Sequence, residues 1–224
     1  MKNIKLIIEK IRRRLYWKKY GKRVNHRDFS LFSNNCLAGI IYHELKIKFL
    51  SPTINTFINP IDFIKFSQNI NYYLSLELEY NEMLSKSFEY PVGNLGDVTI
   101  FFPHKFKNFK DAKEKFLARS SRINYEKIGF IFCDGLSIGE DNNETTNENI
   151  FDFLQISYNK IIITAKKIED VSILHSSKVF FDLATAEKIL YSSTKIIDFI
   201  NSINNDKKDS IDKTRNTENK RGNI

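Results

Sequence analysis

The sequence predicts a three-layer α/β domain in which helices flank a mostly parallel or mixed β-sheet. Two observations carry this prediction. Short runs that are apolar throughout alternate along the chain with longer segments whose apolar residues recur at helical spacing. Strands that are apolar on both faces are typical of sheets covered by helices on both sides. We expect the domain to span residues 28–200, after a basic helix at 1–27 and before a disordered polar tail at 201–224.

The first 27 residues carry the positive charge of the chain. They hold eleven Lys and Arg against the single acid Glu9, whereas the rest of the chain holds 24 basic and 26 acidic residues. A basic amphipathic helix is predicted by the spacing of Ile4, Ile7, Ile8, Ile11 and Leu15. Such a helix can lie on an anionic membrane surface through residues 2–23, or it can pack on the domain and leave its charges in water. Because the body is near neutral, we expect no nucleic-acid partner.

The domain begins with a stretch, Phe29 to Phe57, that reads as a strand, a polar turn, a helix and a second strand. The first strand ends at Phe32, where Ser33-Asn34-Asn35 follows with side chains suited to capping a helix. Apolar residues at helical spacing then predict a helix from Leu37 to Leu45. Polar groups therefore gather where the first strand ends.

The remaining elements follow from similar patterns. Asn59 before Pro60 is a good helix start, because proline fits the first turn. We expect Leu117 to point inward from a later helix, together with Ala112 and Phe116. The predicted helices span residues 60–79, 109–121, 150–154 and 184–200, and the predicted strands span residues 97–102, 128–133, 160–164 and 179–181.

Composition excludes several classes of protein. The two cysteines, Cys36 and Cys133, are too few for a disulfide framework and lack partners at zinc-ligand spacing. No apolar stretch approaches the roughly 20 residues that span a bilayer, and the N-terminus is too charged for a signal peptide. No Asp-x-Asp motif is present, and the Gly93 and Gly96 spacing is not a nucleotide-binding fingerprint. We expect a cytoplasmic protein without metal or cofactor.

Several polar residues follow predicted strands, and we expect them to converge. Ligands of open α/β sheets usually bind beyond the carboxyl ends of the strands. Taken singly, Asn34 and Asn35 are as well explained as caps, and Asp134 as a turn residue before Gly135. The set comprises Asn34, Asn35 and Cys36 after the first strand, Thr53 and Asn55 around the second, then His104, Asp134 and Thr164 after the following three.

Histidines are better candidates for catalysis than Cys36. On one helix, Cys36 and His43 lie about 10 Å apart along the axis, which is too far for a hydrogen bond. A buried, inert role for Cys36 is the commoner one. His43 and His104 can act as a general base or contact a phosphate, because an imidazole titrates near neutral pH. A surface or capping role remains open for both.

Two arginines end a predicted basic helix. Arg119 and Arg122 lie one helical turn apart, and Asn124 follows them. Paired guanidinium groups can grip a pyrophosphate, as in a nucleotide-activated or lipid-linked sugar. The alternative is ordinary charge complementarity at a helix C-terminus.

Five short motifs in one order resemble a known bacterial family. They are SNNC, YHEL, SPTIN, YPVG-LGD and RIN, and the resemblance covers roughly residues 28 to 167. The family resembled is catalogued as a domain of unknown function, DUF1919, and is known from exopolysaccharide and capsule gene clusters. The chain departs from the family pattern at Leu37-Ala38-Gly39, where the family more often has an aromatic and two small residues, and at Ala165, where the family tends to have histidine.

The resemblance implies a transferase of surface-polysaccharide assembly that is peripheral on the inner face of the cell membrane. Glycosyl transfer is the first expectation, with His43 or Asp97 deprotonating an acceptor hydroxyl and His104 as a further catalytic candidate. Arg119 and Arg122 would stabilise the leaving phosphate. The alternatives are an acyltransferase acting on a sugar hydroxyl and a non-enzymatic, membrane-associated assembly factor.

Overall fold

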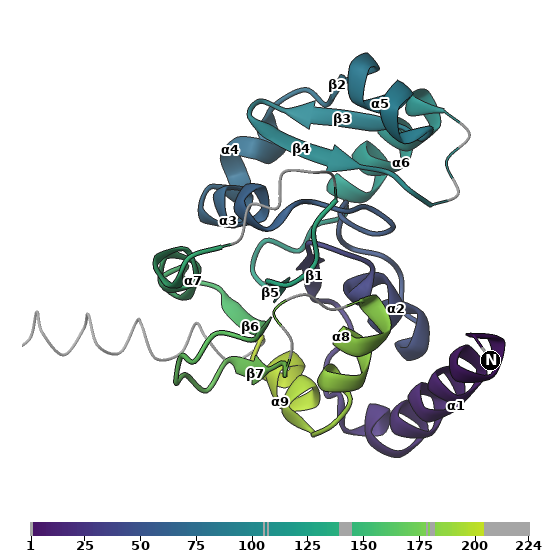
Figure 1. Ribbon diagram of the computed structural model, residues 1–224, viewed down its shortest axis with the longest axis vertical. Helices are drawn as coiled ribbons and strands as arrows, with labels where there is room; N and C mark the ends of the chain where they lie inside the picture. Colours follow the sequence, from purple (N-terminus) through teal and green to yellow (C-terminus); the bar gives the residue numbers. More distant parts are fainter. Residues whose placement is uncertain are drawn as a thin grey trace, which may run out of the picture.

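The computed structural model describes residues 2–104, 106, 108–138, 145–177, 179 and 182–203, with side chains from Ile7 onward. Two sheets form its framework (Figure 1). The parallel sheet contains β1 (Ser30–Ser33), β5 (Ile128–Cys133), β6 (Asn159–Thr164) and β7 (Ile173–His175), in the order β1-β5-β6-β7. The antiparallel sheet contains β2 (Glu79–Tyr80), β3 (Val92–Leu95) and β4 (Val98–Phe101), in that order. The predicted α/β class with a mostly parallel sheet is confirmed.

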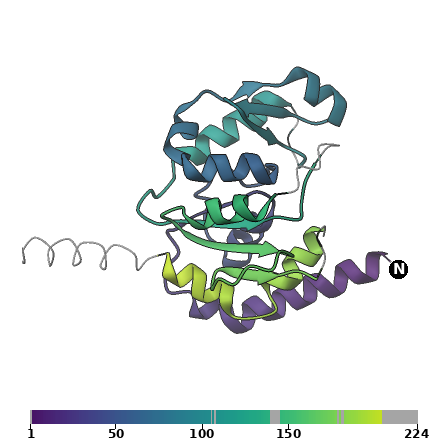
Figure 2. The ribbon, with the colours of Figure 1, turned by 60° about the vertical axis from the view of Figure 1, so that its left-hand side comes forward.

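Helices cover both faces of the parallel sheet because its strands are apolar on both sides. Every residue of β5 is buried: Phe130 and Phe132 point to one face and Ile131 and Cys133 to the other. The face with Ile131 packs against α2 (Leu37–Leu45), α8 (Leu183–Leu190) and α9 (Lys195–Ser202). The opposite face packs against α3 (Pro60–Gln68) and α7 (Asn147–Leu154). This gives three layers (Figure 2).

The antiparallel sheet belongs to a long insertion between the neighbouring strands β1 and β5. The same insertion holds α4 (Ile70–Ser75), α5 (Glu82–Phe88) and α6 (Phe109–Ser120). A backbone bridge between Phe57 and Phe101 joins the antiparallel sheet to the segment that follows β1. Gly96, with φ of +59°, allows the tight turn from β3 into β4.

Several predicted elements differ from the structure. The helix predicted at 60–79 breaks at Asn69, which leaves the helical region, and the helix predicted at 184–200 is split into α8 and α9. The strand predicted before Phe57 is wrong, because that segment forms turns. Leu117 is 50% exposed instead of buried. Val179 lies in a bend, while 180–181 and the tail from 204 onward lie outside the described residues.

The N-terminal helix α1 (Lys2–Tyr20) is anchored through its carboxyl-terminal half and continues into η1 (Gly21–Arg23). The Arg13 guanidinium donates to Glu44 of α2 at 2.9 Å and to Glu187 of α8 at 3.0 Å. Tyr16 and Trp17 are buried, and both rings contact the ring of Tyr191. Within the described residues, no helix is both long and apolar enough to cross a membrane.

Candidate functional site

The polar turn after β1 is used to hold the sheet together. The Asn34 side chain donates to the Cys133 carbonyl at 2.9 Å and accepts from the Cys133 N–H at 3.0 Å. It therefore supplies the next rung between β1 and β5 after the backbone pairing ends at Ser33. The Asn35 side chain accepts from the N–H of Leu37, the first residue of α2, at 2.9 Å. Asn34 and Asn35 are 0% and 2% exposed, and a ligand does not reach them in this conformation.

The SPTIN segment covers the same strand end. The Thr53 hydroxyl accepts from the N–H of Ser33 at 3.3 Å, and the N–H of Ile58 donates to the Asn34 carbonyl at 3.0 Å. Asn55 takes a left-handed conformation with φ of +61°, which asparagine tolerates. A buried polar network therefore fills the position where many parallel sheets bind a ligand.

Arg119 of α6 and Arg122, which lies two residues beyond the end of that helix, both bind backbone in this region. Arg119 is 9% exposed, donates to the Ile54 carbonyl at 2.5 Å and lies over the Phe49 ring at 5.5 Å. Arg122 donates to the Phe49 carbonyl at 3.4 Å and to the Ala118 carbonyl at 2.6 Å. Burial and the neighbouring Arg122 lower the pKa of Arg119. Their predicted contact with a pyrophosphate has no geometric support here.

Asn124 also binds backbone, at the opposite edge of the sheet. Its side chain donates to the Asp28 carbonyl at 2.8 Å and accepts from the N–H of Glu126 at 3.2 Å. Asn124 thus forms the turn that leads into β5, near the amino end of β1.

The charged cluster at the carboxyl edge centres on Asp134, directly after β5. Its Oδ2 accepts from Lys166 Nζ at 3.0 Å and from the Thr164 hydroxyl at 2.6 Å, and its Oδ1 accepts from the Thr145 hydroxyl. The side chains of Asp134 and Lys166 are 6% and 18% exposed. We name these four residues the Asp134 cluster. The adjacent strands β5 and β6 bring it together, as expected of a parallel sheet.

A hollow of about 390 Å³ opens beside the Asp134 cluster. The amino end of α7 forms one wall, where the Thr146 side chain accepts from the N–H of Asn149 in a capping box. The lining residues are Asp134, Thr145, Thr146, Asn147, Ala165, Lys166 and Val179. Of the predicted site residues, Asp134 alone lines this hollow. Its volume is in the range of small-molecule sites.

A larger hollow, about 500 Å³, lies at the amino ends of β6 and β7 and is lined by Lys160, Lys195 and Asp198 among others. Lys160 already donates to the carbonyls of Leu154 and Ile156 at 2.8 and 2.7 Å. We favour the smaller hollow because it holds a largely buried acid and base at the edge where parallel sheets bind ligands.

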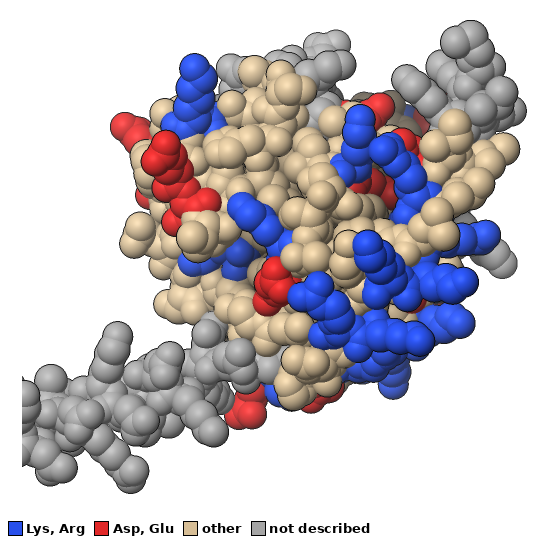
Figure 3. All heavy atoms as spheres, turned by 90° about the horizontal axis from the view of Figure 1, so that it is seen from below, with Lys and Arg blue, Asp and Glu red and all other residues tan. Residues whose placement is uncertain are grey.

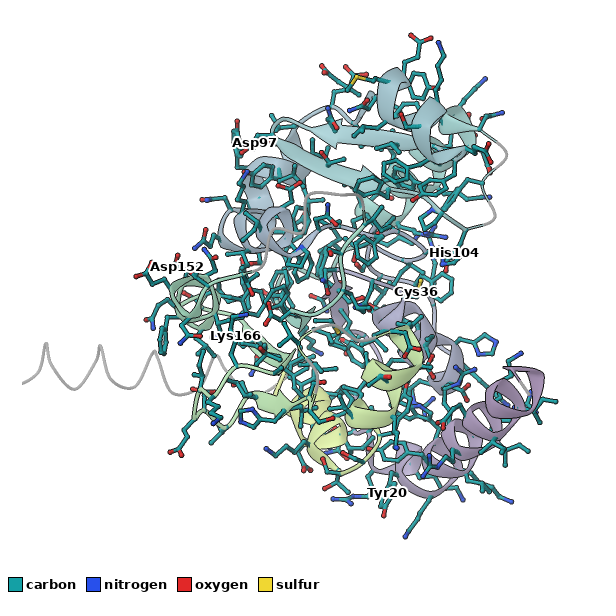
Figure 4. The ribbon with its side chains drawn as sticks, in the orientation of Figure 1. Tyr20, Cys36, Asp97, His104, Asp152 and Lys166 are labelled. Atoms are coloured by element: carbon teal, nitrogen blue, oxygen red, sulfur yellow. The ribbon has the colours of Figure 1, made fainter. Side chains whose placement is uncertain are left out.

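The three predicted catalytic residues are not brought together. The His43 side chain is 79% exposed on α2, and His104 is exposed. Asp97 lies at the β3–β4 turn, where it accepts from Lys65 Nζ at 3.1 Å and from the Tyr73 hydroxyl at 2.9 Å. Figure 4 places Asp97, His104 and Lys166 in three separate parts of the molecule. His104 follows β4, which belongs to the antiparallel sheet, whereas Asp134 follows a strand of the parallel sheet.

Cys36 precedes α2 as a half-buried thiol. Burial, followed by the negative charge of Glu187, raises its pKa to about 11, and burial raises the pKa of Cys133 to about 12. A raised thiol pKa lowers the thiolate fraction at neutral pH. Neither cysteine is therefore poised as a nucleophile.

We expect iodoacetamide at pH 7.5 to alkylate the folded protein far more slowly than the protein in denaturant, where both cysteines are exposed. Intact-mass spectrometry follows the reaction, and the denatured sample is its control. Rapid labelling of Cys36 in the folded protein contradicts this account and restores a thiol mechanism.

No metal site is visible in the part of the chain that the structure describes, since no three His, Cys, Asp or Glu side chains there are grouped to hold an ion. The sequence did not mark Lys166 or Thr145 as site residues. Lys166 carries a weak signal, because it stands two residues after a buried strand. Thr145 lies in a polar stretch without any pattern that marks it.

The fold and site define an α/β protein with an insertion between β1 and β5 and an acid–base cluster at the carboxyl edge of its parallel sheet. The chain belongs to the family described as domain of unknown function DUF1919, whose model matches residues 7–213. It is similar to an uncharacterized protein of Haemophilus influenzae, with 29% identity over 163 residues that cover 73% of this chain and 74% of the relative.

Proposed function

We propose that this protein is a cytoplasmic transferase of bacterial exopolysaccharide or capsule assembly that moves a glycosyl group from a nucleotide-activated or lipid-linked sugar. The observation that carries the proposal is the Asp134 cluster beside its hollow. A largely buried carboxylate and ammonium in a concave site at a sheet's carboxyl edge favour a reacting polar ligand over a purely structural role. The five motifs resemble a family known from polysaccharide gene clusters, and this resemblance is the support for a role in exopolysaccharide or capsule assembly.

In this proposal Asp134 and Lys166 have different roles in the reaction. Asp134 takes the proton of an acceptor hydroxyl, whose oxygen forms a bond to the anomeric carbon of the donor. The bond from that carbon to the phosphate oxygen breaks, and its electrons stay on the phosphate beside Lys166. The hydroxyls of Thr145 and Thr164 hold the Asp134 carboxylate in place. These roles replace the ones that the sequence suggested for His43, Asp97, Arg119 and Arg122.

Thermal unfolding with a panel of nucleotides, nucleotide sugars and acyl-CoA tests the donor class. A ligand at 100 times its dissociation constant adds about 2.7 kcal/mol to the free energy of unfolding. For a chain of this size the unfolding temperature then rises by roughly 5 to 11 °C. We expect one nucleotide sugar to give this rise in the wild type and a much smaller rise in Lys166→Met.

Two other results contradict glycosyl transfer from a nucleotide sugar. A rise with acyl-CoA alone replaces it with acyl transfer to a sugar hydroxyl. If no compound raises the unfolding temperature, a nucleotide-activated donor is excluded. A lipid-linked donor or a non-enzymatic assembly factor then remains.

A further inference from the structure

The helix α1 has two opposite faces with different chemistry. The face that carries Arg13, Tyr16 and Trp17 packs on α2 and α8. About half a turn away, at 3.6 residues per turn, runs an apolar stripe that the protein leaves uncovered. The stripe consists of Ile7, Ile8, Ile11 and Leu15, which are 56%, 49%, 50% and 60% exposed. A stripe of this kind normally faces a core or a partner.

Basic side chains border the apolar stripe on both sides. On a helical projection, Arg12 and Lys19 fall on one flank and Lys10 and Arg14 fall on the other, while Lys18 lies at the carboxyl-terminal end of the stripe itself. All five are exposed. The space-filling view in Figure 3 shows blue side chains gathered over α1 with tan side chains between them. Glu9 is the one acid of α1, and it binds Arg12 at 3.2 Å.

This arrangement fits an anionic lipid surface better than a second copy of the chain. In a bilayer, the apolar stripe enters the boundary between headgroups and acyl chains while the flanking Lys and Arg reach the phosphates. Two copies that paired through the same stripe would bring their basic flanks together, and like charges repel. The positive charge of α1 therefore favours an anionic lipid surface over a second copy of the chain as the partner of the stripe.

We infer that α1 is a docking surface for anionic membranes and lies in the plane of the interface with Ile7, Ile8, Ile11 and Leu15 inserted. The anchored face ties this helix rigidly to α2 and α8, so the whole domain is held at the lipid surface. The inference stands independently of the proposed function, because lipid binding needs no substrate.

Figure 2 shows the amino end of α1 on the side of the molecule toward which the β6 arrow points. The carboxyl ends of β5 and β7 point the same way, because both strands pair parallel with β6.

Flotation of the full chain with vesicles tests the docking surface. We expect binding to vesicles of 70% phosphatidylcholine and 30% phosphatidylglycerol and little binding to pure phosphatidylcholine. The triple variant Arg12→Gln, Arg14→Gln and Lys18→Gln should bind on the order of 100-fold more weakly, since each basic residue near an anionic surface contributes about fivefold. The matched control, Lys86→Gln, Lys110→Gln and Lys167→Gln, removes three exposed charges elsewhere and should bind as the wild type does.

A second pair of variants tests the apolar stripe. Ile8→Glu with Ile11→Glu should abolish flotation, whereas Met83→Glu with Val171→Glu, at positions 73% and 90% exposed, should leave it intact. Equal binding to both vesicle types, or unchanged binding of the Ile8 and Ile11 variant, overturns the inference. It is also overturned if sedimentation velocity finds a dimer that this variant dissolves, or if the basic helix binds RNA and ignores vesicles.

Discussion

Replacing Asn34 with alanine should lower the free energy of unfolding by about 3 kcal/mol. Asn34 is fully buried, and its amide satisfies both the N–H and the carbonyl of Cys133. A buried backbone group left without a partner costs about 1 to 3 kcal/mol, and this substitution strips two of them. For a protein with roughly 5 to 15 kcal/mol of total stability, the loss is large.

Urea denaturation checks this value, and the unfolding temperature should fall by roughly 6 to 12 °C. Asn34→Asp keeps the size of the side chain but turns its donor into an acceptor that faces the Cys133 carbonyl, so we expect it to be at least as harmful. Asn71→Ala, at an exposed position of α4, should stay within about 0.5 kcal/mol of the wild type. A small effect of Asn34→Ala contradicts the bridging role and returns Asn34 to the set of candidate ligand-binding residues.

Asp134→Asn and Lys166→Met should each reduce polymer yield to that of a strain that lacks the gene, when the variant is expressed in that strain at the wild-type level. The amide of asparagine cannot accept the acceptor's proton, and methionine cannot neutralise a leaving phosphate. General-base catalysis contributes about 10²- to 10⁴-fold, and charge stabilisation contributes a similar amount. Polysaccharide yield and sugar composition are measured beside the protein level by immunoblot.

The residues that sequence reasoning singled out for catalysis serve as controls. His43→Ala, Asp97→Asn and His104→Ala change exposed side chains outside the Asp134 hollow. Each should retain most of the wild-type yield. If instead these variants fail while Asp134→Asn succeeds, the chemistry lies away from the parallel sheet and the proposed site is wrong.

The sequence predicts the strands of the parallel sheet well where burial alone decides them. The limits predicted for the strand at 128–133 agree with those of β5. A run of six residues without a polar side chain is typical of a strand that helices cover on both faces of the sheet. The helix α2 is likewise predicted from its apolar spacing. The insertion was harder to predict: β2 and β3 are short, and β3 contains Gly93 and Asn94, which weaken any strand pattern.

Errors arose where tertiary contacts override a local pattern. The helix start predicted at Asn59 and Pro60 is confirmed, but the Asn59 side chain is hydrogen-bonded to the backbone of Ile138 instead of the helix. The predicted strand near Thr53 became a series of turns, because its polar groups bind the end of β1 and its backbone binds Arg119. No local pattern reports such long-range partners.

The candidate site was predicted in part. The rule that polar residues meet at the carboxyl edge places Asn34, Asp134 and Thr164 together, and in the structure they lie at the carboxyl ends of three adjacent strands. The sequence pattern does not indicate which of these three side chains faces solvent. Asn34 turned inward to complete the sheet, whereas Asp134 turned toward the hollow. Lys166 could be recognised only once its ion pair with Asp134 was known.

Isothermal titration of the panel compound that gives the largest thermal shift tests the central claim most directly, because it measures binding at the Asp134 hollow without any assumption about the reaction. The account predicts that Lys166→Met weakens binding at least tenfold, which corresponds to about 1.4 kcal/mol. It also predicts that Lys65→Met, at the ion pair of Asp97, leaves the affinity within about twofold. Loss of binding in Lys65→Met and full binding in Lys166→Met would contradict the assignment.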